Sequence, residues 1–327
     1  MVSTVYIFLF FELTQHKQDI WGDISNHFSG LFNGYLYLAL FLMPINWMIE
    51  SVKWRFLIWK IEKISLWTSF QAVLAGTAIS IFTPNRIGDY LGRIFILRKG
   101  DRIDGTIATI VGNISQLLVT IIMGSLAIIY FADEIVNYLY EDSFSFTTAI
   151  RIFIVLGNIA AIFIFFYFPI FERQLNNKFE LFRYPIIKHL NLLSEFNKQQ
   201  LIKVLLLSLF RFLIYSTQFY FIFKAFHINM DYIQGMLTVF LLLLSITIVP
   251  SIAVAELGIR GLIAIFIFSN LNLMPNQQFT DSTLVSVTSL LWLINIVIPA
   301  FFGGLFIFKL RFIRKSDEML FTQKKQD

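Results

Sequence analysis

Five apolar runs long enough to cross a lipid bilayer constrain this chain more than any other feature. A membrane-spanning helix needs about 20 mainly apolar residues to cross roughly 30 Å of hydrocarbon. Runs of this length lie at about 31–50, 106–131, 149–171, 201–223 and 284–308. Their apolar residues are continuous, whereas the strands of a membrane barrel alternate in polarity. We therefore predict an all-α polytopic membrane protein.

Two further apolar regions are interrupted by proline and glycine. The first, 68–98, is broken at Pro84 and Gly88, and the second, 234–270, is broken at Pro250 and Gly258. Irregular backbone at membrane depth is tolerated where protein or a wet cavity satisfies its polar groups. Paired interruptions of this kind are typical of transporters that bind their substrate near the membrane midplane.

Loop charges predict which side of the membrane each segment faces, because lysine and arginine are enriched in cytoplasmic loops. Segment 53–63 carries four basic residues and one acidic residue, whereas 132–148 carries four acidic residues and no basic one. We predict that 53–63 is cytoplasmic and that 132–148 is outside. Region 68–98 must then enter and leave from the cytoplasmic side, as a re-entrant helical hairpin.

Region 234–270 enters from the outside and returns there, either as two full spans or as a second hairpin. The prediction is thus about eight membrane segments, with two broken or re-entrant hairpins in an inverted-repeat-like arrangement.

The whole chain, residues 1–327, is predicted to be one integral membrane domain. Residues 172–200 interleave charged and apolar side chains, which favours a cytoplasmic amphipathic linker on the membrane surface. Residues 309–327 are predicted to form a basic cytoplasmic tail. The N-terminal stretch VYIFLFFEL is too short to span, and we interpret it as a partial first helix whose true start lies upstream.

Composition argues against several other classes of function. The formal net charge is +5, but in a membrane protein excess basic charge is more typical of cytoplasmic loops and anionic headgroups than of nucleic-acid binding. The chain has no cysteine, which excludes disulfides, thiol catalysis and cysteine-ligated metals. Its four histidines are scattered, and no metal-binding or nucleotide-binding motif occurs. We expect no catalytic residue, no metal and no cofactor.

Charged side chains within the apolar regions are the candidate binding residues, because a charge in a bilayer is costly and usually marks function. In the first interrupted region, Arg86, Asp89 and Arg93 have the spacing of one helical face. With the backbone amides freed near Pro84 and Gly88, they are predicted to form a cup for a phosphate. The alternative is a cytoplasmic turn whose arginines extend to the headgroups.

The second interrupted region places Glu256 and Arg260 four residues apart, which predicts an ion pair on one helix. The pair is interpreted as intramembrane, with a helix end at the outer interface as the alternative. Arg211 lies roughly ten residues into its helix, too deep to reach the interface easily, and is predicted to face a cavity.

Polar residues on two other spans are also candidates. Asn46, Glu50 and Arg55 lie at or after the end of the run 31–50, where they are either binding residues or interfacial anchors. Asn113, Gln116 and Thr120 form a polar stripe on the run 106–131, for which bridging between helices is the favoured interpretation.

Three stretches together resemble a known family. NWMIESVKWRFLI, FQAVLAGTAISIFTPNRIGDYLGRIFIL and VPSIAVAELGIRGLIAIFIF are similar, in order and spacing, to the membrane region of the lysylphosphatidylglycerol synthase family. The matching residues are Asn46, Trp54, Arg55, Pro84, Arg86, Gly88, Asp89, Glu256, Gly258 and Arg260. Each motif alone is degenerate, whereas the three in sequence are fairly specific.

The resemblance implies a helical membrane bundle with re-entrant elements that moves phospholipid between leaflets. It also implies a stand-alone flippase-like protein without the soluble aminoacyltransferase domain of full-length synthases. The chain departs from the family at VGNISQ, where many members carry an Asp-Arg pair.

We therefore expect a flippase for anionic or aminoacylated phospholipid in the bacterial cytoplasmic (inner) membrane, with a cytoplasmic C-terminus. One alternative is an integral membrane enzyme acting on lipid-linked substrates, with Asp89 or Glu256 as the base. Another is a non-transporting subunit of an envelope complex. The expected partners are membrane phospholipids, then a lipid-modifying synthase or envelope protein and a second copy of the chain; nucleic acid is not expected.

Overall fold

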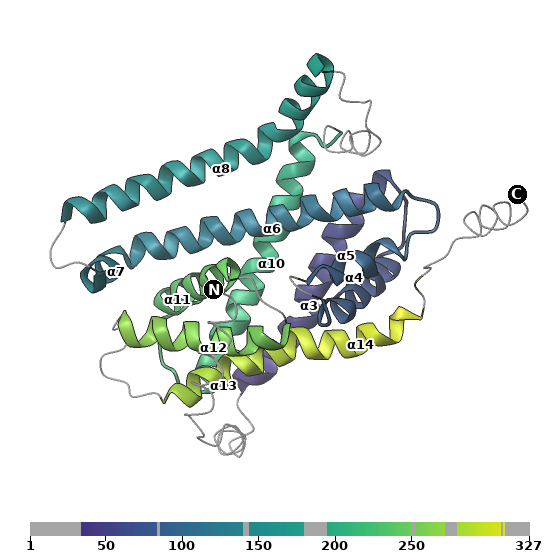
Figure 1. Cartoon of the computed structure of the whole chain (residues 1–327). Coiled ribbons are helices and arrows are strands. Elements are labelled where there is room, and N and C mark those ends of the chain that lie inside the picture. Colours follow the sequence, from purple (N-terminus) through teal and green to yellow (C-terminus); the bar gives the residue numbers. More distant parts are fainter. Residues whose placement is uncertain are drawn as a thin grey trace, which may run out of the picture.

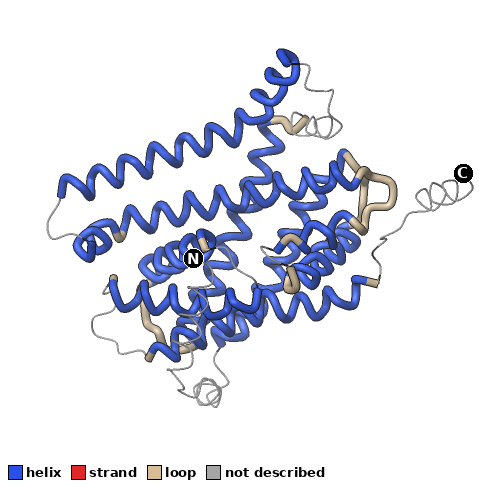
Figure 2. Tube along the Cα trace, viewed as in Figure 1, coloured by secondary structure: helices blue, strands red, loops and turns tan. Residues whose placement is uncertain are grey.

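The computed structural model describes residues 34–83, 86–139, 144–179, 195–249, 253–271, 280–308 and 310. Within these residues the chain is helical and contains no strand, as Figures 1 and 2 show. The helices are α3 (Gly34–Leu57), η1 (Ile58–Lys60), α4 (Leu66–Ser80), α5 (Gly88–Ile94), α6 (Arg102–Tyr130), α7 (Ala132–Leu139), α8 (Phe144–Phe179), α10 (Lys198–Ala225), α11 (Tyr232–Ile248), α12 (Ala253–Asn270), α13 (Asp281–Trp292), η4 (Leu293–Val297) and α14 (Ile298–Ile307). The predicted all-α class is confirmed.

Five helical stretches in the described part of the chain are long and apolar enough to cross a membrane. They are Gly34–Lys60, Arg102–Tyr130, Phe146–Tyr167, Lys198–Ala225 and Asp281–Ile307. Each contains most of one predicted run, so the five runs are confirmed as candidate spans. The predicted partial first helix lies outside the described residues, and so does the basic tail 309–327 apart from Leu310.

The first of these spans extends beyond its predicted end. Residues 53–57 continue α3, and η1 follows directly, so the predicted loop 53–63 is largely helical. Lys53 is only 1% exposed because its ammonium group lies 2.8 Å from the Glu50 carboxylate inside the bundle. The loop assignment for these residues was wrong, since a charge count along the sequence does not separate a surface lysine from a buried ion pair.

Helices α4 and α5 form a tight antiparallel hairpin in the region 68–98. A Cβ atom on Gly92 would overlap the backbone of Gly76, and one on Gly88 would lie 2.6 Å from the backbone of Ile79. The pairing of 92 with 76 and of 88 with 79 makes the two helices run in opposite directions. Small residues permit such close approach of two helix backbones. The helical hairpin is therefore present, and its placement in a membrane stays a prediction.

Helices α11 and α12 make up the second interrupted region. The interruption lies between Ile248 and Ala253, and Pro250 falls outside the described residues, as does Pro84. Helix α12 continues through Gly258 without a break, so the prediction that Gly258 interrupts the helix was wrong. A glycine inside a helix costs only about 1 kcal/mol relative to alanine, and this helix tolerates it.

The helices assemble around two buried apolar clusters. One cluster lies mainly between α10, α11 and α12, and the other between α3, α4 and α6. Helices α3 and α10 run antiparallel and join the two clusters, with Gln218 on α10 donating to the carbonyl of Ala39 on α3 at 2.8 Å. Polar side chains from several of these helices line a cavity between the two clusters, which is described below.

Helix α8 lies at the edge of the bundle beside α6 (Figure 1). In its apolar stretch Phe146–Tyr167, no residue of the most apolar 18-residue window is buried inside the protein. The helix runs to Phe179, α10 begins at Lys198, and residues 180–194 lie outside the described part. The amphipathic linker 172–200 thus stays a prediction, although its first eight residues belong to α8.

Candidate functional site

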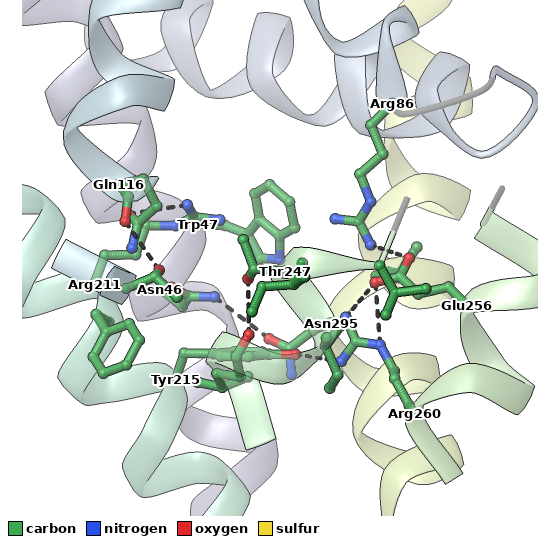
Figure 3. Close-up of a pocket in the computed structure, with 17 residues that line it drawn as sticks. Asn46, Trp47, Arg86, Gln116, Arg211, Tyr215, Thr247, Glu256, Arg260 and Asn295 are labelled. Carbon is green, nitrogen blue, oxygen red and sulfur yellow. Dashed lines mark hydrogen bonds and ion pairs between the residues drawn. The ribbon is translucent and has the colours of Figure 1, made fainter. Parts of the chain in front are cut away.

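A cavity of about 670 Å³ lies between the connection of α4 to α5 and the facing ends of α11 and α12. Its wall comes from α3, α6, α10, α11, α12, η4 and the connection between α4 and α5. The polar lining residues are Asn46, Arg86, Gln116, Thr120, Arg211, Tyr215, Thr247, Glu256, Arg260 and Asn295 (Figure 3). Segments that are distant in sequence therefore converge on one polar chamber within an apolar bundle.

The tip of the first hairpin presents Arg86 to the cavity. Arg86 has a φ of 57°, in the left-handed region that is uncommon for residues other than glycine. The Thr83 hydroxyl accepts a hydrogen bond at 2.7 Å from the backbone N–H of Gly88, where α5 begins. The bend held by this cap points the Arg86 side chain away from its own hairpin, toward α12.

The start of α12 supplies the carboxylate that pairs with Arg86. Glu256 lies in the first turn of α12, and its Oε2 is 2.6 Å from Nη2 of Arg86. Its Oε1 is 2.5 Å from Nη2 of Arg260 one turn later, as the i, i+4 spacing predicts. Arg260 also donates from Nη1 to the Tyr215 hydroxyl on α10 at 3.0 Å. The predicted Glu256–Arg260 ion pair is confirmed, and one carboxylate joins α12 to the connection between α4 and α5.

The opposite end of the cavity is organised by Glu50. This carboxylate is buried and forms ion pairs with Lys53 at 2.8 Å, Arg93 at 2.8 Å and Arg211 at 3.2 Å. Arg93 is bound in turn by Asp89 at 2.8 Å. Because Lys53 and Arg93 are held behind Glu50, Arg211 is the cation of this cluster that faces the cavity.

Neutral polar and aromatic residues fill the space between the two ends. Asn46 on α3 donates to Asn295 at 3.5 Å, and Gln116 on α6 accepts from Arg211 at 3.4 Å. The Arg211 guanidinium lies 5.6 Å from the centre of the Trp47 ring, within cation–π range. Figure 3 shows Thr247 and Asn295 between the Arg211 end and the Arg86–Glu256–Arg260 end.

Two features of the predicted site are not formed. Arg86 lies before the start of α5 and pairs with Glu256, whereas Arg93 pairs with Glu50, so Arg86, Asp89 and Arg93 do not share a helical face. The positive φ of Arg86 breaks the helical spacing on which that prediction relied. Arg55 also lies apart from the cavity: its Nε donates to the carbonyl of Ile64 at 2.9 Å.

The polar stripe on α6 divides between two roles. Asn113 donates to the Tyr90 hydroxyl at 2.9 Å and so bridges α6 to α5, as the favoured interpretation predicts. Gln116 bridges to α10 through the carbonyl of Ser208, and Gln116 and Thr120 also line the cavity. Bridging and lining are therefore combined in this stripe.

Sequence reasoning missed Lys53, Trp47, Thr247 and Asn295. The available signal for Asn295 was a single amide in the apolar run LLWLINIVIPA. It sits in η4, a π-helical turn in the middle of the span Asp281–Ile307. Such turns are rare and are frequently found at functional sites.

Comparison with known families agrees with this architecture. A family model described as the lysylphosphatidylglycerol synthase TM region matches residues 2–303. The chain belongs to this family. No curated protein matched the chain in a sequence search. Family membership and the apolar helices make it a membrane protein related to lipid handling, and they confirm the resemblance seen in the sequence.

Proposed function

We propose that this protein is a flippase, which moves anionic or aminoacylated phospholipid between the leaflets of the bacterial cytoplasmic membrane. The observation that carries the proposal is the cavity between the α4–α5 connection and α12, because three arginines line it: Arg86, Arg211 and Arg260. Guanidinium groups bind phosphate through paired, charge-assisted hydrogen bonds. The family to which the chain belongs supports phospholipid as the source of that phosphate.

The lengths of the hairpin arms support a site deep in the membrane. Helix α4 has 15 residues and α11 has 17, so they rise about 22 Å and 25 Å at 1.5 Å per residue. A hydrocarbon core is about 30 Å thick. If the hairpins enter from opposite sides, as loop charges predict, both tips reach the central part of the bilayer.

The proposed path carries the headgroup alone. The phosphate passes between the arginines while the acyl chains stay in the surrounding lipid, so the protein does not have to shield them. Glu50, Asp89 and Arg93 lie behind the cavity and hold Arg211 and α5 in place, which is a positioning role. Translocation needs no bond making or breaking, and the proposed activity is therefore transport without catalysis.

Reconstitution tests the proposal directly. Purified protein in vesicles, supplied with fluorescent phosphatidylglycerol, is assayed for translocation by dithionite quenching of the outer leaflet. The Arg86→Ala, Arg260→Ala double variant is expected to lose at least about tenfold in rate, equivalent to about 1.4 kcal/mol. Arg55→Ala is the matched control, because it removes an arginine on α3 that does not line the cavity. A double variant that translocates as fast as the wild-type protein would show that the path does not run through the cavity.

A further inference from the structure

We infer that the cavity is built for a headgroup that carries two phosphates separated by a short uncharged spacer. This inference rests on the proposed function, because it takes the ligand to be a lipid, and it narrows the substrate class.

The charges around the cavity do not cancel. The ion-pair network contains five cationic side chains, Lys53, Arg86, Arg93, Arg211 and Arg260, and three carboxylates, Glu50, Asp89 and Glu256. Among the described residues, this network therefore has two positive charges in excess. An unpaired charge away from bulk water is costly, and in proteins it is usually matched by a partner. A ligand with two negative charges would match both.

The excess is divided equally between the two ends of the cavity. At one end, Arg211, Arg93 and Lys53 exceed Glu50 and Asp89 by one charge. At the other, Arg86 and Arg260 exceed Glu256 by one charge. Thr247 and Asn295 lie between the ends in Figure 3. Two adjacent phosphates, as in a diphosphate, would neutralise one end and leave the other unmatched.

Each end keeps one cation accessible to a ligand. The Arg86 side chain is 44% exposed and that of Arg211 is 23% exposed, whereas Lys53 and Arg93 are buried behind Glu50. Each accessible guanidinium can therefore contact a phosphate without breaking the buried pairs.

The Arg211 end also contains donors with no acceptor. Within the described residues, Nε of Arg211 and Nε1 of Trp47 are buried and have no hydrogen-bond partner. Both residues line the cavity, and Trp47 is more than nine-tenths buried. Buried donors are nearly always paired in native proteins, so two free N–H groups beside an excess cation indicate an acceptor-rich ligand. Phosphate oxygens supply such acceptors.

Lipid binding to the purified full-length protein in micelles tests this inference. The probes are diphosphatidylglycerol, which has two phosphodiesters joined by a glycerol, and phosphatidylglycerol, which has one. We expect diphosphatidylglycerol to bind at least about tenfold more tightly, well beyond the twofold statistical advantage of a second phosphate. Equal affinity per phosphate would overturn the inference.

Variants that change the charge of the cavity show which residues cause the preference for diphosphatidylglycerol over phosphatidylglycerol. Arg211→Gln and Arg86→Gln each leave one excess charge, and each is expected to bring the two lipids to within about twofold of one another. The Arg86→Gln, Glu256→Gln double variant again has two excess charges, with Arg260 freed, and is expected to regain the preference. Arg55→Gln is the matched control outside the cavity. A preference that survives Arg211→Gln would overturn the two-ended site, and thermal unfolding of each variant confirms that it is folded.

Two further measurements distinguish a lipid headgroup from a soluble bisphosphate, and a failure of this inference from a failure of the proposed function. Glycerol 1,3-bisphosphate that competes as strongly as the lipid would overturn the lipid source and leave a soluble bisphosphate as the ligand. Phosphatidylglycerol translocation is measured on the same preparations. Translocation without a binding preference overturns only this inference, whereas a binding preference without translocation of either lipid overturns only the proposed function.

Discussion

Replacing Glu50 by glutamine should destabilise the protein more than any other single loss of charge in the network. The Glu50 side chain is 2% exposed and contacts Lys53, Arg93 and Arg211 at 2.8, 2.8 and 3.2 Å. Each contact is worth about 5–6 kcal/mol of gross attraction at an effective dielectric constant of 20. Desolvation of the charges and repulsion among the three cations offset most of this sum. Breaking a buried pair by removing one partner typically costs about 3–5 kcal/mol, and we expect a loss in that range.

The assay is the free energy of unfolding, measured by titrating the protein with sodium dodecyl sulfate in mixed micelles. Asp133→Asn is the matched control, since it breaks the Asp133–Arg151 ion pair at 2.9 Å, whose side chains are 63% and 36% exposed. Exposed pairs contribute about 1 kcal/mol or less, so this control should unfold almost like the wild-type protein.

A second variant tests the stated cause. Adding Lys53→Met to Glu50→Gln removes one cation along with the carboxylate and keeps an apolar side chain of similar length in the same space. The double variant should therefore be more stable than Glu50→Gln alone, by at least about 1 kcal/mol. If Glu50→Gln unfolds within about 1 kcal/mol of the wild-type protein, or if Lys53→Met only adds to its destabilisation, Glu50 does not stabilise the protein by neutralising buried cations.

Three other variants test separate parts of the structure. Gly92→Ala places a methyl group on the backbone of Gly76, so we expect the free energy of unfolding to fall by at least about 2 kcal/mol. The control Gly157→Ala has open space at its Cβ and should change this free energy by less than about 1 kcal/mol in either direction. Equal effects of the two variants would contradict the tight α4–α5 contact. Tyr215→Phe removes the hydroxyl that accepts from Arg260 at 3.0 Å, and should cost about 1.5–3 kcal/mol in the same titration; no loss would mean that this bond does not hold Arg260. Lys99→Cys, on the connection between α5 and α6, should react with a membrane-impermeant maleimide from the cytoplasmic side alone, and labelling from the outside would overturn the predicted topology.

Much of the fold could be predicted from the sequence, because membrane spans are set by local composition. The five long apolar runs became five candidate spans, and the interruption near Gly88 became a helical hairpin. The same local rule failed at Lys53. A lysine after an apolar run normally reaches the interface, but here Glu50, Arg93 and Arg211 come together from three helices and make burial possible.

The sequence indicated many of the residues that form the candidate site, but it did not indicate which of them contact one another. Arg86 and Glu256 each stood out as a charge at a break in an apolar region, although they are 170 positions apart in the sequence. Their contact required the fold, because nothing local to either residue specifies its partner. Arg86 and Arg93 were assigned to one face for the same reason, since helical spacing was assumed across a residue whose backbone is left-handed.

Chemical blockade of the cavity during lipid translocation shows whether the lipid passes through it. The chain has no cysteine, so Thr247→Cys introduces a single thiol on an exposed side chain in the cavity wall. Phe153→Cys places the matched thiol on the exposed face of α8, away from the cavity. After treatment with a methanethiosulfonate reagent, the Thr247→Cys protein should lose most of its phosphatidylglycerol translocation, and the Phe153→Cys protein should keep it. Full translocation by the modified Thr247→Cys protein, with complete labelling shown by mass spectrometry, would contradict a lipid path through this cavity.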